Sequence, residues 1–143
     1  EEYYVDIMSA NLVNPAVRGR YQVILTPNLY GDILTDEAAQ LQGGVGTAGS
    51  ANLGDRYAMF EAIHGSAPRM IAEGLGDYAN PESILRAVCM LLEHIGCGEK
   101  AGRLAQAIDA ARKNVGQVTG DEKGPTCAAF GDGVMAALNG AQA

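Results

Sequence analysis

The stretch "NLYGDILTDEAA" (residues 28–39) decides the local fold, because an apolar run ends just before it and a helical pattern begins within it. It places Asp32 and Asp36 four residues apart. On an α-helix this spacing separates two side chains by about 40° of rotation, so both carboxylates project from nearly the same face. A helix that carries two like charges side by side needs an explanation.

Two interpretations of the aspartate pair are open. Neighbouring carboxylates repel each other, and a divalent cation turns that repulsion into attraction. With no His or Cys nearby, oxygen ligands favour Mg²⁺ or Mn²⁺ over Zn²⁺. In the structural alternative, Asp32 caps the start of a helix and complements its dipole, while Asp36 faces solvent. On local pattern alone the structural interpretation is favoured.

The elements around this stretch follow from apolar spacing. Residues 5–13 have apolar side chains at helical intervals and end at Asn14-Pro15, which predicts a helix. Residues 21–26 ("YQVILT") predict a short strand that stops at the following proline. A helix is then expected over residues 32–42, ended by Gly43-Gly44.

The second part of the chain continues the alternation. Residues 43–54 are rich in Gly, Ala and Ser and are expected to form a loop, and residues 58–63 to form a strand. Asn80-Pro81-Glu82 is a strong helix start, with Asn as the cap. The remaining expected helices are 80–96, 100–115 and 126–138. Strands that alternate with helices predict a layered α/β fold.

Composition excludes several classes of function. The chain has 143 residues, 48% of them hydrophobic and 19% charged, which suits a packed core rather than disorder. Its net charge of −7, with scattered basic residues, argues against binding nucleic acid or an anionic membrane. No apolar run approaches the length of a membrane span. Three cysteines without C-x-x-C spacing indicate reduced thiols and a cytoplasmic protein.

A glycine motif in this chain suggests a dinucleotide-binding Rossmann fold and is rejected. Residues 44–49 ("GVGTAG") fit G-x-G-x-x-G. That motif must follow a strand and open a helix, whereas here a predicted helix precedes it. One match among 19 glycines is also weak evidence.

Three segments, taken together, resemble one known family. They are "TPNLYGDILTDEAAQLQGGVGTAGSANLGD", "FEAIHGSAPRM" and "YANPESILRAVCMLLEHIG". In their order and spacing they are similar to the C-terminal part of the β-decarboxylating dehydrogenases, the family of isocitrate and 3-isopropylmalate dehydrogenases. The resemblance covers essentially the whole chain and is strongest at residues 23–96. It implies the layered, non-Rossmann α/β fold of that family, incomplete in this chain.

The resemblance implies a metal site. In this family both helix aspartates bind the Mg²⁺ or Mn²⁺ that holds the substrate, and they correspond to Asp32 and Asp36. A third family aspartate, supplied by the partner subunit, corresponds to Asp6, which could otherwise be an exposed helix acid. The implied chemistry is Lewis-acid catalysis during oxidation and decarboxylation of a 2-hydroxy acid. A homodimer is therefore expected.

The resemblance also implies a nucleotide site. Residues 64–68 ("HGSAP") resemble the loop that lines the adenosine half of the dinucleotide, and Asn80 resembles the residue that bonds adenine. Taken alone, His64 is a turn residue and Asn80 a helix cap, and Asn80 can do both. The implied cofactor-binding residues are His64, Gly65, Ser66, Ala67, Arg69, Asn80 and Asp121.

The choice between NAD and NADP depends on a few positions. Family members that use NAD usually carry Asp straight after H-G-S-A-P, and those that use NADP often carry Lys then Tyr. This chain has Arg69-Met70, and an arginine can pair with a 2′-phosphate. Where NADP users have Tyr and Arg, the chain has Gly120 and Gly124, which favours NAD with Asp121 on the ribose. NAD is expected, and NADP is possible.

Other family features lie outside this chain. The family's proton-transferring Tyr and Lys and its substrate-reading Ser and Arg cluster are expected upstream. Residues 1–42 resemble the end of the small, dimer-forming domain and residues 43–143 the C-terminal part of the large, nucleotide-binding domain. We therefore expect a fragment that is inactive alone. Isocitrate is the expected substrate, because residues 69–79 differ from the short loop usual in isopropylmalate enzymes.

Alternative functions remain open. Within the family the substrate alternatives are 3-isopropylmalate, homoisocitrate, and tartrate or malate. A non-catalytic regulatory subunit or inactive remnant is a different class, although subunits that lose catalysis tend to lose the metal aspartates, which are present here. The last alternative is an α/β domain without an active site.

Overall fold

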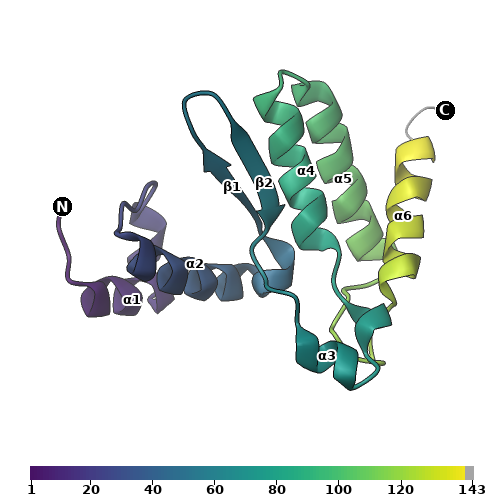
Figure 1. The fold of residues 1–143 in the computed structure, drawn as a ribbon, viewed down its shortest axis with the longest axis horizontal. Coiled ribbons are helices and arrows are strands. Elements are labelled where there is room, and N and C mark those ends of the chain that lie inside the picture. The colour runs from purple at the N-terminus through teal and green to yellow at the C-terminus, as the bar shows by residue number, and fades with distance from the viewer. Residues whose placement is uncertain (141–143) are drawn as a thin grey trace. The chain divides into compact units, whose positions relative to one another are not determined.

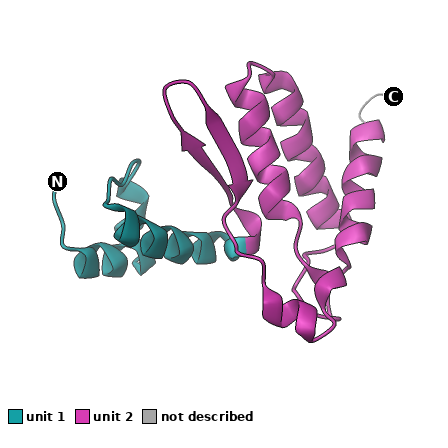
Figure 2. Ribbon diagram, in the orientation of Figure 1, with its two compact units in different colours: residues 1–45 teal, residues 46–143 magenta. Residues whose placement is uncertain are grey.

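The computed structural model describes residues 1–140, in two compact units (Figures 1 and 2). The first unit is Glu1–Val45 and the second is Gly46–Ala143. The sequence suggested a division after residue 42, three residues before this boundary. The assignment of the parts to a small and a large domain stays a prediction. Each unit is described by itself.

The first unit is built on two helices, α1 (Val5–Val13) and α2 (Asn28–Gln42). A 3₁₀ turn at Arg18–Arg20 lies between them. Met8 and Leu12 of α1 are buried against Leu34 of α2, and this small apolar cluster holds the helices together. The bounds of α1 confirm the prediction made from apolar spacing.

Helix α2 begins one turn earlier than the sequence suggested. It starts at Asn28, after the extended residue Pro27, so Asp32 lies inside the helix rather than at its cap. The cap interpretation of Asp32 is therefore wrong. The end of α2 is confirmed, because Gly43 stops the helix with a φ of 134°, a value that favours glycine.

The strand predicted at residues 21–26 is not formed. Residues 21–26 form neither helix nor strand, and among the described residues no strand pairs with them. Two of its apolar side chains face water: Val23 is 86% exposed and Leu25 is 96% exposed. An extended chain without a hydrogen-bonded neighbour is not a strand, and the sequence could not show that the neighbour is missing.

The second unit opens with a β-hairpin. Strand β1 (Gly49–Leu53) pairs antiparallel with β2 (Ala58–Ala62), with Gly49 opposite Ala62 and Leu53 opposite Ala58. The prediction of β2 is confirmed. The prediction of a loop over residues 43–54 is wrong in its second half. Residues 49–53 have low strand propensity, but they form β1 because β2 pairs with them.

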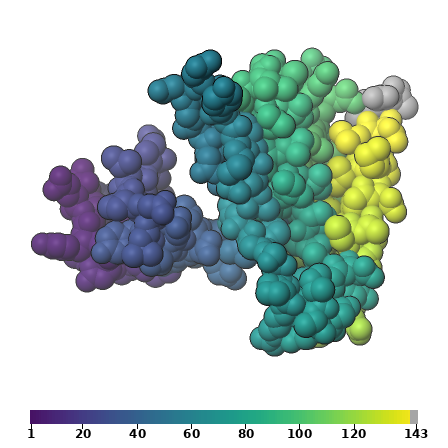
Figure 3. Space-filling view, viewed as in Figure 1, coloured from purple at the N-terminus to yellow at the C-terminus, as the bar shows by residue number. Residues whose placement is uncertain are grey.

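The helices of the second unit stand in a row beside the hairpin (Figures 1 and 3). The hairpin packs on α4 (Glu82–His94), α4 packs on α5 (Gly98–Asn114), and α5 packs on α6 (Cys127–Gly140). A short helix, α3 (Pro68–Ala72), follows the hairpin, and a 3₁₀ turn at Gly76–Tyr78 follows α3. The three long helices confirm the predicted ones to within two residues at most ends. The core between them consists of Cys89, Ala107, Ile108, Ala111, Val118, Phe130 and Val134.

Two simple findings complete the fold. None of the helices within residues 1–140 combines the length and apolar character that a bilayer crossing requires. Cys89, Cys97 and Cys127 are free thiols.

Candidate functional site

The paired aspartates of α2 lie on an open helix face. Asp32 and Asp36 are both exposed, and their spacing of four residues on a continuous helix puts them one turn apart. Within residues 1–140 neither carboxylate has an ion-pair or hydrogen-bond partner. Like charges at this spacing destabilise a helix slightly when no cation is present. Asp32 and Asp36 as metal ligands stay a prediction.

The third predicted ligand lies apart from this pair in the chain. Asp6 is exposed in the first turn of α1, where its Oδ1 accepts a hydrogen bond from the N–H of Ile7 at 2.8 Å. Within residues 1–140 no three His, Cys, Asp or Glu side chains come close enough together to hold one metal ion. One copy of this chain thus offers two neighbouring oxygen ligands, and a Mg²⁺ or Mn²⁺ ion takes at least one more from elsewhere.

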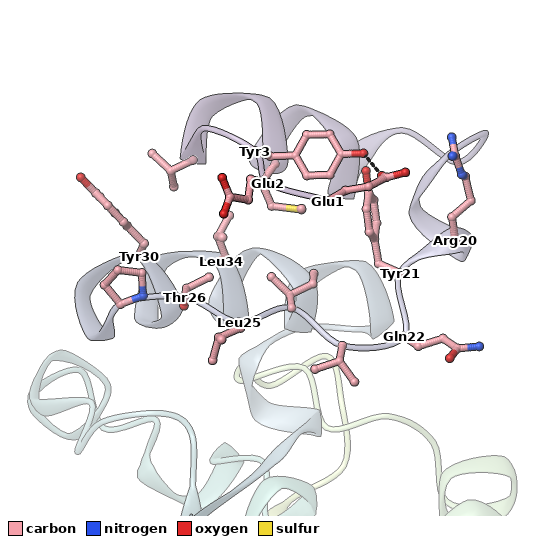
Figure 4. Close-up of a pocket in the computed structure, with 15 residues that line it drawn as sticks. Glu1, Glu2, Tyr3, Arg20, Tyr21, Gln22, Leu25, Thr26, Tyr30 and Leu34 are labelled. Atoms are coloured by element: carbon pink, nitrogen blue, oxygen red, sulfur yellow. Dashed lines mark hydrogen bonds between the residues drawn. The ribbon is translucent and has the colours of Figure 1, made fainter.

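A separate hollow of about 910 Å³ opens in the first unit beside the unpaired segment 21–26 (Figure 4). Its lining is mostly apolar and aromatic, and the ring of Tyr3 meets that of Tyr21 edge-on with centroids 5.9 Å apart. The residues that line it include neither aspartate of α2. The hollow is therefore not the cation site.

In the second unit, the segment with residues 64–68 leaves the end of β2 and leads into α3. His64 to Pro68 are exposed, and the His64 Nδ1 lies 3.0 Å from the carbonyl oxygen of Gly65. Ala67 has a left-handed backbone, with φ 46° and ψ 55°, and within residues 1–140 it is the one non-glycine residue with positive φ. Such a conformation costs an alanine about 1–2 kcal/mol, and strain of this kind gathers at functional loops.

Asn80 links the start of α4 to a second loop. Its side-chain oxygen accepts a hydrogen bond from the N–H of Glu82 at 2.9 Å, although α4 begins at Glu82 and its cap position is Pro81, one residue later than the sequence suggested. Its Nδ2 donates to the carbonyl oxygen of Val118 at 3.4 Å. An amide has two acceptor sites and two donors, and these two bonds use one of each.

Asp121 lies in the loop that follows Val118 and is held in a fixed, charged form. The Thr119 hydroxyl donates to its Oδ1 at 2.7 Å, and the N–H of Lys123 donates at 3.1 Å. These hydrogen bonds hold the pKa of the Asp121 carboxyl below its usual range. A β-carbon placed on neighbouring Gly120 would lie 3.3 Å from the Met70 methyl, so this loop lies against α3.

The structure thus gathers most of the predicted nucleotide residues at one end of the second unit. Asn80 holds the loop with Asp121, and that loop lies against α3, which directly follows residues 64–68. Arg69 at the start of α3 has a side chain that is 88% exposed, with its Nε 2.6 Å from Glu73. It therefore points into solvent rather than into the packed interior.

Two buried polar residues near Asn80 were missed by sequence reasoning. The hydroxyl of Ser83, fully buried, donates to the carbonyl oxygen of Ala48 and accepts from the N–H of Ile63 at 3.2 Å. The available signal was the small-residue face of α4: Ser83 and Ala87, one turn apart, predict a close approach of another segment.

Glu82, only 1% exposed, is the second residue missed. Its Oε1 lies 3.1 Å from an Arg86 nitrogen and 3.6 Å from an Arg112 nitrogen, so two cations compensate the buried charge. Burial disfavours the charged form of Arg86, but its hydrogen bonds to Asp109 and Glu82 raise its pKa. From the sequence, Glu82 was expected only to place a favourable negative charge at the start of a helix. Its burial between two arginines was not expected.

Comparison with known proteins agrees with the arrangement of these elements. A family model described as isocitrate/isopropylmalate dehydrogenase matches residues 1–134. Isocitrate dehydrogenase [NADP] of Rickettsia typhi is 48% identical over 108 residues, which is 75% of this chain and 21% of that protein. A probable isocitrate dehydrogenase [NAD] subunit alpha, mitochondrial, of Drosophila melanogaster is 39% identical over 140 residues, or 96% of this chain and 36% of that protein.

A solved structure shows the same fold. The crystal structure of isocitrate dehydrogenase from Methylococcus capsulatus matches with a TM-score of 0.83 and 36% identity, over 94% of this chain and 39% of that one. The chain therefore spans between about a fifth and two fifths of the length of these proteins. The family model and the solved structure each match over nearly all of the chain. The chain therefore belongs to the isocitrate/isopropylmalate dehydrogenase family.

Proposed function

We propose that this chain is the C-terminal part of a metal-dependent NAD(P) oxidoreductase that oxidises and decarboxylates a 2-hydroxy acid, with isocitrate as the substrate. The observation that carries the proposal is the aspartate pair on α2, which faces solvent without a cationic partner among the described residues. An uncompensated pair of charges is retained at a small cost in stability, and binding a cation is the function that explains it. The pair also favours a catalytic chain over a non-catalytic subunit, because subunits that lose catalysis tend to lose the metal aspartates.

The proposed metal ligands are Asp32 and Asp36 of one subunit and the partner subunit's Asp6, in a homodimer. When bound, Mg²⁺ or Mn²⁺ supplies Lewis-acid polarisation of the substrate's oxygens. The two α2 carboxylates fix where the ion and its substrate lie, since both project from one rigid helix. Because Asp6 is exposed at the start of α1, it is free to reach a site on another chain.

The proposed nucleotide site is the end of the second unit where residues 64–67, Asn80 and Asp121 lie. The spare donor and acceptor of Asn80 suit an adenine edge. We propose NAD as the preferred cofactor, because an ionised Asp121 accepts hydrogen bonds from ribose hydroxyls and repels a 2′-phosphate. NADP is the alternative, and Arg69 is the residue that would pair with its phosphate.

Isocitrate is proposed over the other acids on two grounds. The relatives described above are named isocitrate dehydrogenases, although a homoisocitrate dehydrogenase and a 3-isopropylmalate dehydrogenase are similar to this chain at 42% and 48% identity. Residues 69–79 form a helix and a 3₁₀ turn, a longer connection than the short loop expected for isopropylmalate enzymes. The alternatives within the family are 3-isopropylmalate, homoisocitrate and tartrate.

The metal proposal is tested by titrating the 143-residue chain with Mn²⁺ and following free Mn²⁺ by electron paramagnetic resonance. Asp32→Asn or Asp36→Asn should weaken binding about tenfold or more, since each removes a ligand charge. Asp55→Asn, which changes an exposed aspartate in the hairpin turn, is the matched control. Equal weakening in all three variants would show unspecific attraction to a chain of net charge −7 and refute the site.

A further inference from the structure

Residues 46–49 pass unusually close to the first two turns of α4. A β-carbon placed on Gly46 would lie 3.1 Å from the β-carbon of Asn80. One placed on Gly49 would lie 2.6 Å from the backbone nitrogen of Ala87, closer than real side chains come. Two glycines of the rejected G-x-G-x-x-G motif thus have a packing role: they let this segment lie directly on the helix.

Ser83 lies between these two contacts and joins three elements through one hydroxyl. It donates to Ala48, just before β1, and accepts from Ile63, just after β2. Since Ser83 is fully buried, water cannot replace either bond. Ile63 directly precedes His64, so this hydroxyl fixes the point at which the exposed loop of residues 64–68 leaves the hairpin.

A residue just before α4 also holds a second loop. Asn80, three residues before Ser83, holds the carbonyl of Val118, which leads into the loop with Asp121. Two residues around the start of α4 therefore hold the two loops that are predicted to line the nucleotide site. Asn80 holds the loop with Asp121, and Ser83 holds the loop of residues 64–68.

We propose that Ser83 is a positioning residue for the dinucleotide site: without touching the nucleotide, it sets the position of residues 64–67 relative to Asn80. This inference rests on the proposed function, because it assigns a role within that nucleotide site. Without the hydroxyl, the N–H of the half-buried Ile63 loses its acceptor and the loop loses its anchor. The strained backbone of Ala67 needs such an anchor to persist.

The first measurement is native-state hydrogen exchange of the 143-residue chain, residue by residue, by NMR. In Ser83→Ala the amide of Ile63 should exchange about tenfold faster, with smaller increases at residues 64–67, while amides of α5 and α6 are unchanged. Ile108→Val is the control, because it loosens the core without touching the loop. Uniform acceleration in both variants, or none at Ile63, would overturn the proposal.

The second measurement is titration of each variant with NAD⁺, followed by chemical-shift changes. Weaker binding in Ser83→Ala, with unchanged binding in Ile108→Val, supports positioning, and equal weakening in both overturns it. If the unmodified chain does not bind NAD⁺ but the exchange effect is local, the anchor is upheld and the proposed nucleotide function fails. Should Ser83→Ala not fold, Ser83→Cys takes its place: its thiol is a weaker hydrogen-bonding group, so exchange at Ile63 should be faster than in the unmodified chain, and an unchanged rate would overturn the proposal.

Discussion

At Gly49 the lack of a side chain sets the distance between β1 and α4. Gly49→Ala would press a methyl group onto the backbone of Ala87, so the free energy of unfolding should fall by roughly 1–3 kcal/mol. Gly102→Ala is the control: it lies within α5 with open space around it and should raise the free energy of unfolding by about 0.5–1 kcal/mol. Urea denaturation measures both, and a stabilising Gly49→Ala would contradict the close approach.

Cys89 should be the slowest of the three cysteines to react. It is 8% exposed, and burial raises the pKa of its thiol, so less thiolate is present at a given pH. We expect iodoacetamide at pH 8 to label Cys97 and Cys127 first, and all three equally in denaturant, as mass spectrometry of the peptides would show. Because the pKa is higher in the folded state, the stability linked to this thiol is lost as the pH rises above its unfolded value of about 8.5.

Single residues were predictable where one local rule governs them. The helix stop at Gly43 follows from the chain next to it and is confirmed. The bond from Glu82 to Asn80 is also local, although the cap position itself lies at Pro81. The role of Ser83 depends on Ala48 and Ile63, which are 35 and 20 residues away, so no local pattern contains it. The aspartate pair lies between these cases. The spacing of Asp32 and Asp36 can be read from the local sequence, but the ion proposed to bind them cannot.

At the scale of elements, the unpaired segment 21–26 should be the first site of proteolysis. Its backbone has no strand partner within the described residues, and Leu25 is almost fully exposed. Proteases cut extended, exposed chain. Brief thermolysin digestion followed by intact-mass measurement should show cleavage beside Val23, Ile24 or Leu25 before any cleavage in β1 or β2. First cleavage within the hairpin would show that this segment is protected.

The two errors in strand prediction have the same origin. Residues 49–53 have poor strand propensity but form β1, because β2 and α4 supply hydrogen bonds and packing. Residues 21–26 have good propensity but form no strand, because no described strand lies beside them. Helices were predicted better because their hydrogen bonds close within the segment. Strand propensity shows that a segment would fit into a sheet, but it does not show that a neighbouring strand is present.

At the scale of the whole molecule, the 143-residue chain alone should not reduce NAD⁺ or NADP⁺ with isocitrate. The proposed machinery needs proton-transferring and substrate-reading residues that have no counterpart in residues 1–143, and the chain spans only 21% of its Rickettsia relative. Absorbance at 340 nm, with Mn²⁺ and isocitrate in excess, measures this. A complete relative provides the positive control, and isocitrate-dependent reduction by the short chain would refute the expectation.

The family and fold were predictable from three motifs in the right order, and the comparisons confirm both. A set of metal ligands shared between two subunits is harder to predict than a fold. The sequence contains each aspartate, but it does not show the symmetry that would bring aspartates of two subunits together. Asp32 and Asp36 were predictable as neighbours since one helix holds both. Asp6 as their companion stays a prediction.

The continuity of α2 through residues 32–36 limits how this stretch can evolve. Deleting or inserting one residue between the two aspartates would rotate the second by about 100° and turn it to another side of the helix. The turn at residues 54–57, by contrast, can lengthen without moving either strand of its hairpin. For the proposed cation site, the number of residues between Asp32 and Asp36 is therefore fixed, whereas the exposed Ile33 and Thr35 between them can change in type and the buried Leu34 cannot.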